Sequence, residues 1–316
     1  MIDVILLGCG ATMPTPERGL SAAVLRCGGR SVLFDCGEGT QAALRREKVS
    51  PVKIDLIALS HYHGDHVFGL PGLLQTMNCL HRTEPLTLTG PEGLDALAAP
   101  ILALAGPLDY ELRLLPEAEL PLRSLHPAWP ALARLRPFPT EHRVPSLGYA
   151  FELPRPPRFL PERARALGVP MALWKAILEG EPDAPILLGG EPLRHEGRIL
   201  RAADLTDGPR KGLRVVFSGD TMPCAATREA ARGADLLIHD ATYGEDAQEA
   251  EAALWGHSTF RQATALAREA QASRLWLTHF SQAMTAPEAY LPEAAALFPG
   301  AVCGRDGLRL TLSFDH

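Results

Sequence analysis

Clusters of polar side chains follow four separate apolar runs of this chain, and they constrain its fold more than any other feature. Each run is short and rich in Leu, Ile, Val, Phe or Trp, as expected of a buried strand. The runs with their clusters are IDLIALSHYHGDH from Ile54, LRVVFSGDT from Leu213, ADLLIHDATY from Ala234 and SRLWLTHFS from Ser273. Sheet-based enzymes present their sites at the carboxyl ends of strands, where the loops begin. The repetition predicts a sheet-rich α/β layered fold with a site at one edge.

The remaining sequence agrees with this layered fold. Short strands are predicted in the first 40 residues, separated by glycine-rich turns, and three segments have the spacing of amphipathic helices. The predicted strands cover 3–8, 22–28 and 31–37, and the predicted helices cover 39–47, 68–80 with an interruption near Pro71, and 258–272. From Pro107 to Pro161 recurrent prolines favour short strands and turns over long helices.

The composition is that of an ordinary globular protein. The chain has 316 residues and a net charge of −6, and no apolar run approaches the length of a membrane span. The opening MIDVILLGCG has no basic region, so we expect no signal peptide. The six cysteines are scattered without a CxxC pair, which indicates reduced thiols. We therefore expect a cytoplasmic protein that does not bind membranes.

The loop HYHGDH, from His61 to His66, has the composition of a metal site. Two histidines two residues apart can converge on one ion, and Asp65 with His66 can reach a second ion beside it. Imidazole and carboxylate ligands suit zinc, or another divalent ion such as manganese. Gly64 lets the backbone bend tightly enough to aim these side chains at neighbouring points. The loop therefore predicts a site for two metal ions.

Two ions need more ligands than this loop supplies. Candidates follow other predicted strands: His142 in PTEHRVPS, Asp220 in FSGDT and His279 in LTHFS. With the loop, the total is seven, which matches two four-coordinate ions that share one carboxylate and one water. Isolated histidines elsewhere in the chain are more often ordinary core or surface residues, so we assign them no role.

Several motifs together resemble the metallo-β-lactamase superfamily and, more closely, its ribonuclease Z family. The HxHxDH pattern alone indicates only the superfamily. The more specific motifs are LGCGATMPTPERGLS, LFDCGEGTQ, SHYHGDHVFGLPGLL, RKGLRVVFSGDT, GHST at Gly256–Thr259 and LTHFS. They occur in the family's order and cover nearly the whole chain.

The resemblance implies an αβ/βα sandwich of two mixed sheets flanked by helices, formed by one domain over 1–316 and usually a homodimer. It implies two zinc ions per subunit. By the resemblance, His61, His63 and His142 hold one ion, Asp65, His66 and His279 hold the other, and Asp220 bridges them.

The activity implied is removal of the 3′ trailer from precursor tRNA, by attack of a metal-held hydroxide on a phosphodiester. The products are a tRNA with a 3′-hydroxyl and a trailer with a 5′-phosphate. Asp65 would orient or deprotonate the attacking water, and His257 would protonate the leaving ribose oxygen. Asp240 would orient His257, although the family commonly has a glutamate at that position.

An arm over 153–182 opens with a proline-rich stretch, and MALWKAILEG in it is predicted to form a short helix. A net acidic protein needs a local basic surface to bind RNA. The arm offers Arg155, Arg158, Arg163, Arg165 and Lys175, and family members use an arm here to bind tRNA away from the metals. The alternative is a surface excursion whose arginines only keep it soluble.

Two other functions remain open at this point. A hydrolase of the same superfamily that acts on a small phosphodiester, a thioester or a lactone would keep the metals without needing a basic arm or the GHST motif. A non-catalytic RNA-binding subunit would have lost metal ligands, whereas all seven candidates are present in this chain.

Overall fold

The computed structural model describes residues 1–179 and 183–314. The chain divides into two compact units. Unit 1 contains residues 1–153 and the described residues from 213 on, and unit 2 is Pro154–Gly212. Unit 2 begins one residue after the predicted start of the arm and continues well past Pro182. Residues 180–182, which belong to the predicted arm, lie outside the described residues.

Two seven-stranded sheets form the centre of unit 1. The first has the order β18-β1-β2-β3-β4-β5-β6 and the second the order β17-β16-β15-β14-β9-β8-β7. In the first sheet the strands are β1 (Ile2–Gly8), β2 (Ala22–Cys27), β3 (Arg30–Phe34), β4 (Ile54–Ala58), β5 (Leu86–Thr89), β6 (Leu112–Leu115) and β18 (Arg309–Leu312). In the second they are β7 (Leu120–Pro121), β8 (Arg134–Pro139), β9 (Leu147–Arg155), β14 (Arg210–Phe217), β15 (Leu236–Asp240), β16 (Leu275–Thr278) and β17 (Ala301–Cys303).

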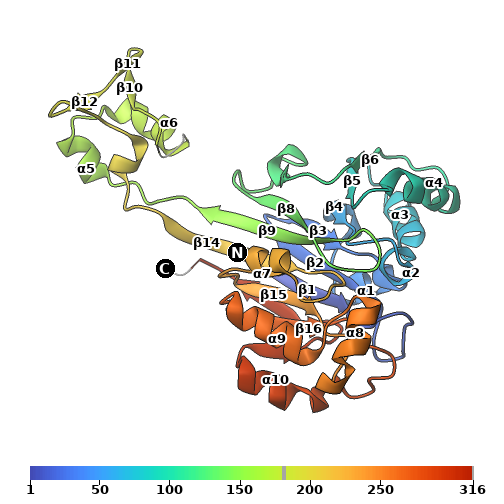
Figure 1. Cartoon of the computed structure of the whole chain (residues 1–316). Helices are drawn as coiled ribbons and strands as arrows, with labels where there is room; N and C mark the ends of the chain where they lie inside the picture. Colours follow the sequence, from blue (N-terminus) through green and yellow to red (C-terminus); the bar gives the residue numbers. More distant parts are fainter. Residues whose placement is uncertain (180–182, 315–316) are drawn as a thin grey trace. The chain divides into compact units, whose positions relative to one another are not determined.

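Helices cover the outer face of each sheet. Figure 1 shows α3 and α4 beside β4 and β5, and α9 and α10 beside β15 and β16. The helices of unit 1 are α1 (Thr40–Arg46), α2 (Gly64–Val67), α3 (Leu70–Cys79), α4 (Leu94–Ala105), α7 (Ala225–Ala230), α8 (Glu249–Trp255), α9 (Phe260–Glu269) and α10 (Leu291–Leu297). Short 3₁₀ turns in the chain are η1 (Pro51–Lys53), η2 (Leu122–Ser124), η3 (Met171–Leu173), η4 (Ala202–Leu205), η5 (Asp246–Gln248) and η6 (Pro287–Ala289).

The alternation of side chains along β1 shows why the sheets stack. Val4 and Leu6 join the core between the sheets, which also contains Phe151 of β9. Ile5 and Leu7 point the other way, into a second core with the helices α1, α3 and α4. Strands buried on both faces need apolar residues at nearly every position, as the predicted strands have. The predicted sandwich of two mixed sheets flanked by helices is therefore confirmed.

The predicted helices are also present, with one difference in detail. Pro71 does not interrupt a helix, because α3 begins at Leu70 and Pro71 stands in its first turn. A proline costs little there, since the first N–H groups of a helix have no partner within the helix. Thr259 caps α9 through its side chain, which accepts a hydrogen bond from Gln262 N.

Parallel strands bring the polar clusters to one edge. β3, β4 and β5 pair in parallel in the first sheet, and β14, β15 and β16 pair in parallel in the second. The two edges meet where Phe34, at the end of β3, stacks on Phe217, at the end of β14, with ring centroids 5.4 Å apart. The loops that follow these strands therefore lie close together.

Unit 2 has a small core of its own. The five buried apolar side chains of this core are those of Ala164, Val169, Ile186, Leu200 and Leu205. Its elements are α5 (Pro161–Ala166), α6 (Trp174–Glu179), β10 (Leu187–Leu188), β11 (Glu191–Pro192), β12 (Arg194–His195) and β13 (Arg198–Ile199), and η3 followed by α6 forms the predicted short helix. Across both units, no helix in the described part of the chain is long and apolar enough to cross a membrane.

Candidate metal centre

The structure brings all seven predicted ligands together at the shared edge of the two sheets. They come from the loop after β4 and the helix α2, from the connection between β8 and β9, and from the loops that follow β14 and β16. The seven are His61, His63, Asp65, His66, His142, Asp220 and His279, and their ligand atoms form overlapping groups in which all atoms lie within 4.8 Å of one another.

Three imidazoles form the first group. His61 Nε2 lies 2.9 Å from His63 Nδ1, which lies 3.3 Å from His142 Nε2. The same three residues are the set expected for one ion.

Asp65, His66 and His279 form the second group. Asp65 Oδ2 lies 3.7 Å from His66 Nε2 and 3.4 Å from His279 Nε2, and the two imidazole nitrogens are 3.3 Å apart. The backbone N–H of Thr12 donates to the same carboxylate oxygen over 2.7 Å, which fixes its direction. His279 has a φ of 62°, so its backbone is held in the left-handed region at this point.

Asp220 stands between the two groups. Its Oδ2 lies 3.7 Å from His61 Nε2, 3.3 Å from His66 Nε2 and 3.2 Å from His279 Nε2. Gly219 before it has a φ of 61°, and a Cβ there would meet the Ser60 side chain at 2.6 Å. Only glycine therefore allows the loop after β14 to approach the loop after β4 this closely.

The spacing of these atoms fits metal coordination. Ligand atoms about 2.0–2.1 Å from a tetrahedral ion lie roughly 3.3 Å from one another. The distances within the two groups, from 2.9 to 3.7 Å, bracket that value. Such a cluster of convergent imidazole nitrogens and carboxylate oxygens is difficult to explain as ordinary core packing, because buried ionisable groups are rarely gathered at one point unless they bind an ion or carry out chemistry.

The other nitrogen of four of these imidazoles has its own partner. His61 Nδ1 lies 3.0 Å from Ser60 Oγ, and His66 Nδ1 lies 2.7 Å from Asp35 Oδ2. His142 Nδ1 lies 2.8 Å from the carbonyl of Gly256, and His279 Nδ1 lies 2.9 Å from Thr242 Oγ1. Such partners orient the ring so that Nε2 faces the centre.

Asp35 is not among the residues predicted from the sequence, yet its side chain contacts a candidate metal ligand. It is fully buried, with a φ of 55°. Its carboxylate accepts hydrogen bonds from Ser60 N (2.7 Å) and Ser60 Oγ (2.9 Å) as well as from His66 Nδ1. The signal was present in LFDCGEGTQ, but nothing in that motif alone shows which histidine Asp35 contacts.

Electrostatics hold three imidazoles and two carboxylates in the forms that bind metal. Burial lowers the pKa of His61 well below its usual value, and burial also lowers the pKa of His63 and His142. Burial alone would raise the pKa of Asp220 and Asp65, but the neighbouring histidines outweigh it and lower both. Neutral imidazoles and ionised carboxylates are the ligating forms.

His66 shows where positive charge is favoured. Burial opposes its protonation, but the carboxylates of Asp220 and Asp35 outweigh burial and raise its pKa well above the usual value. The carboxylates therefore create a strongly negative potential at this histidine, which a bound cation would neutralise.

His257 adjoins the metal centre, and Asp240 holds it. Nδ1 of His257 lies 2.7 Å from Asp240 Oδ2, and its ring centroid is 5.1 Å from that of His142 and 5.2 Å from that of His279. Asp240 also accepts from Thr221 N, Thr242 N and Thr242 Oγ1. Burial would lower the pKa of His257, but Asp240 outweighs it and raises the pKa to about 9. The shorter aspartate therefore reaches His257.

The five basic residues predicted to bind RNA all belong to unit 2, whereas the candidate metal ligands all belong to unit 1. Arg158, Arg163, Arg165 and Lys175 are exposed, and Arg155 is half-buried at the end of β9. Arg165 pairs with Glu162 over 2.7 Å and lies over the Trp174 ring at 5.5 Å. Their role in RNA binding stays a prediction.

Two family models match this chain. A model of the metallo-beta-lactamase superfamily matches residues 16–130, and a model of the beta-lactamase superfamily domain matches residues 205–280. The matched segments contain six of the seven candidate ligands, all but His142. With the sandwich of two sheets and the convergent His and Asp side chains, they define a hydrolase of the metallo-β-lactamase superfamily that uses a divalent metal.

Relatives that match along the whole chain give the family. A ribonuclease Z of Lachnoclostridium phytofermentans is 38% identical over 316 residues, covering 100% of this chain and 99% of the relative. A ribonuclease Z of Methanosarcina acetivorans is 37% identical, covering 99% of each. The crystal structure of the short form of human tRNase Z has a TM-score of 0.67 and 26% identity, covering 99% of this chain and 100% of that one. The chain belongs to the ribonuclease Z family.

Proposed function

We propose that this chain is an endoribonuclease that removes the 3′ trailer from precursor tRNA. The observation that carries the proposal is the convergence of seven candidate ligand side chains beside His257, whose Nδ1 lies 2.7 Å from the buried carboxylate of Asp240. The full-length similarity to proteins named ribonuclease Z supports the choice of an RNA phosphodiester as the bond that is cut.

We propose two zinc ions as the resident metals, with manganese as a possible replacement. His61, His63 and His142 would hold one ion, Asp65, His66 and His279 the other, and Asp220 both. Nitrogen and oxygen donors at tetrahedral spacing suit zinc. When bound, two such ions would lower the pKa of a coordinated water and neutralise charge on the phosphoryl oxygens.

The chain's own residues then position the reaction. Asp65 lies 3.4 Å from His279 Nε2, and its carboxylate is held by Thr12 N, so it can orient the attacking water. The negative charge of Asp240, which accepts from Nδ1, favours the imidazolium form of His257, and in that form Nε2 carries a proton that it can give to the leaving 3′ oxygen of the ribose. The expected products are a tRNA with a 3′-hydroxyl and a trailer with a 5′-phosphate.

We propose that unit 2 binds tRNA through Arg155, Arg158, Arg163, Arg165 and Lys175. The chain carries a net charge of −6, so contact with the RNA backbone must come from a local group of basic residues. The exposure of four of these five side chains supports this role.

We also propose a homodimer in the cytoplasm. The dimer rests on the resemblance to the ribonuclease Z family. A reducing compartment is supported by the six cysteines, all of them described residues, which are free thiols.

The experiment that tests the function is incubation of the metal-loaded protein with an end-labelled precursor tRNA and, separately, with a small phosphodiester, a thioester and a lactone. Release of the trailer at one position is expected. Hydrolysis of a small ester with intact precursor tRNA would instead show a small-molecule hydrolase of the same superfamily.

A further inference from the structure

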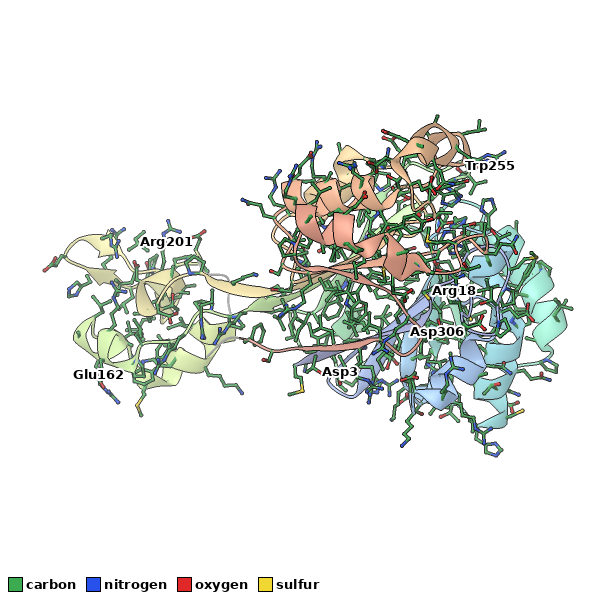
Figure 2. All side chains as sticks on the ribbon, turned by 90° about the horizontal axis from the view of Figure 1, so that it is seen from below. Asp3, Arg18, Glu162, Arg201, Trp255 and Asp306 are labelled. Carbon is green, nitrogen blue, oxygen red and sulfur yellow. The ribbon has the colours of Figure 1, made fainter. Side chains whose placement is uncertain are left out.

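Trp255 is a large, partly exposed aromatic side chain two residues before His257. Two of the four tryptophans, Trp129 and Trp276, are buried, and Trp174 packs within unit 2. Trp255, the last residue of α8, is 46% exposed on the surface of unit 1 (Figure 2). Core packing therefore does not account for its exposed surface, which is free to contact a ligand.

Arg143 lies against the ring of Trp255. The guanidinium carbon is 4.5 Å from the ring centroid, which is the geometry of a cation–π pair. Arg143 is itself exposed and directly follows the candidate ligand His142. An indole ring with a guanidinium beside it offers both a flat apolar face and a positive charge.

The pair is held at a fixed place beside the metal ligands. The carbonyl of Gly256 accepts from His142 Nδ1 over 2.8 Å. Gly256 has a φ of 76°, and a Cβ there would meet His142 Nδ1 at 2.8 Å and Arg143 N at 3.1 Å. The end of α8 that carries Trp255 and the segment that carries Arg143 therefore lie against each other at Gly256, and the candidate ligand His142 is part of that contact.

The position of Trp255 relative to His257 indicates which part of a substrate it would meet. The two residues are separated by Gly256 alone, so their Cα atoms are at most about 7 Å apart. His257 is the group assigned to the leaving 3′ oxygen. A base attached to that same ribose lies a similar short distance from the oxygen.

We propose that Trp255, with Arg143 beside it, is a stacking platform for the base of the nucleotide that keeps the new 3′-hydroxyl. This inference rests on the proposed function, because it assumes a polynucleotide in the site. Every base has a flat π face, so stacking on an aromatic ring holds a nucleotide without selecting its identity. The platform would thus place the ribose oxygen at His257 in precursors that differ in sequence.

The test combines protein variants with modified precursors. Wild type, Trp255→Ala and Trp255→Phe are assayed on three precursor tRNAs: one intact, one with an abasic residue on the 5′ side of the scissile bond, and one with an abasic residue on its 3′ side. Leu254→Ala is the matched control, because it removes an apolar side chain that is 71% exposed one residue away.

On the intact precursor, Trp255→Ala should lower kcat/KM by roughly 5- to 150-fold, the usual effect of losing one stacked base. Trp255→Phe should recover most of the loss, and Leu254→Ala should match wild type. The 5′ abasic precursor should be a similarly poor substrate for wild type. With the Trp255→Ala protein, changing from the intact to the 5′ abasic precursor should lower kcat/KM little further, since the stacking contact is already missing.

Three results would overturn the inference while leaving the proposed function intact: equal effects of Trp255→Ala and Leu254→Ala, additive losses with the 5′ abasic precursor, or a change of oligomeric state as the only effect of Trp255→Ala. Coupling to the 3′ abasic residue instead would show that the platform serves the trailer and would contradict the stated side. A wild-type protein that cleaves no precursor would reject the proposed function and this inference with it.

Discussion

Nδ1 of His257 lies 2.7 Å from Oδ2 of Asp240, and Asp240 is completely buried. The contact joins a side chain at the rim of the metal centre to the end of β15, deep in the second sheet. It gives a histidine that would otherwise lose its proton on burial a pKa of about 9.

Replacing Asp240 by Asn should lower kcat on precursor tRNA and move its pH profile. An acid that must carry its proton loses function as pH rises through its pKa. Asp240 raises the pKa of His257, so removing its charge lowers that pKa and brings the alkaline decline to lower pH. The measurement is kcat against pH for wild type, Asp240→Asn, Asp240→Glu and His257→Ala.

His257→Ala should lose about 100- to 10,000-fold in kcat, as is typical for a general acid. Asp240→Glu should keep the alkaline decline near its wild-type position. An unshifted decline in Asp240→Asn would show that Asp240 does not set the protonation of His257.

Replacing Asp35 by Asn should weaken metal binding about 10- to 100-fold, the usual effect of losing the partner of a ligating histidine. The amide cannot accept from Ser60 and His66 in the same way as the carboxylate. Metal affinity is measured by competition with a chelator, on protein whose fold is checked by circular dichroism.

The matched control for Asp35 is Asp235→Asn. Asp235 is also a buried aspartate that accepts a backbone hydrogen bond, from Arg214 N over 2.8 Å. It lies at the amino end of β15, the opposite end from the metal centre. The Asp235→Asn protein should bind metal as tightly as wild type. If Asp35→Asn also binds metal as tightly as wild type, Asp35 does not orient His66 for metal binding.

Glu152→Gln should destabilise unit 1 by about 1–2 kcal/mol. Glu152 is buried on β9. Its carboxylate pairs with three partly exposed arginines: Arg134 at 2.7 Å, Arg136 at 3.3 Å and Arg214 at 3.0 Å. Burial would raise the pKa of Glu152, but these arginines outweigh it and lower the pKa. Because the folded pKa is depressed, this contribution is present above the unfolded pKa and is lost as pH falls through the folded value.

The measurement is urea unfolding of wild type and Glu152→Gln from pH 7 down to pH 3. Glu119→Gln is the control, since Glu119 faces the same Arg134 at 3.7 Å but is half exposed. Its effect should stay below about 0.5 kcal/mol. If the difference in unfolding free energy between Glu152→Gln and wild type grew on acidification, the pKa of Glu152 could not be lowered in the folded state.

Neutralising three exposed basic side chains of unit 2 should raise KM for precursor tRNA without altering hydrolysis of a small phosphodiester. The variant is Arg158→Gln, Arg163→Gln and Lys175→Gln combined. Each lost phosphate contact should also make the salt dependence of log(kcat/KM) shallower by about 0.7–0.9. Steady-state kinetics at several salt concentrations measures both effects.

The control carries the same change in net charge on unit 1, as Lys53→Gln, Arg123→Gln and Arg268→Gln, all of them exposed. If this control raises KM as much as the unit 2 variant, general electrostatic attraction explains the binding and unit 2 has no special role.

Much of the fold could be predicted from the sequence, because strands buried on both faces have nearly continuous apolar runs and the polar clusters mark where they end. The strand at Ile54–Ala58 and the loop from His61 are the clearest case. The seven candidate ligands, which the structure brings together, could be chosen by residue type and by their position after predicted strands.

Other features depend on contacts between segments far apart in the chain and could not be predicted. Asp35 contacts His66 through a turn with a positive φ, and Arg143 meets Trp255 across 112 residues of sequence. The extent of unit 2 beyond Pro182 depends on a core built from Ile186, Leu200 and Leu205, which are spaced too irregularly to show a period.

The most direct test of the account is to identify the chemical groups at the two new ends after cleavage of precursor tRNA. In the proposed mechanism, water at the metal centre would attack phosphorus and His257 would protonate the ribose 3′ oxygen, which predicts a 3′-hydroxyl on the tRNA and a 5′-phosphate on the trailer. Mass spectrometry of both fragments reads these groups. A 2′,3′-cyclic phosphate on the tRNA with a 5′-hydroxyl on the trailer would show attack by the RNA's own 2′-hydroxyl and would contradict it.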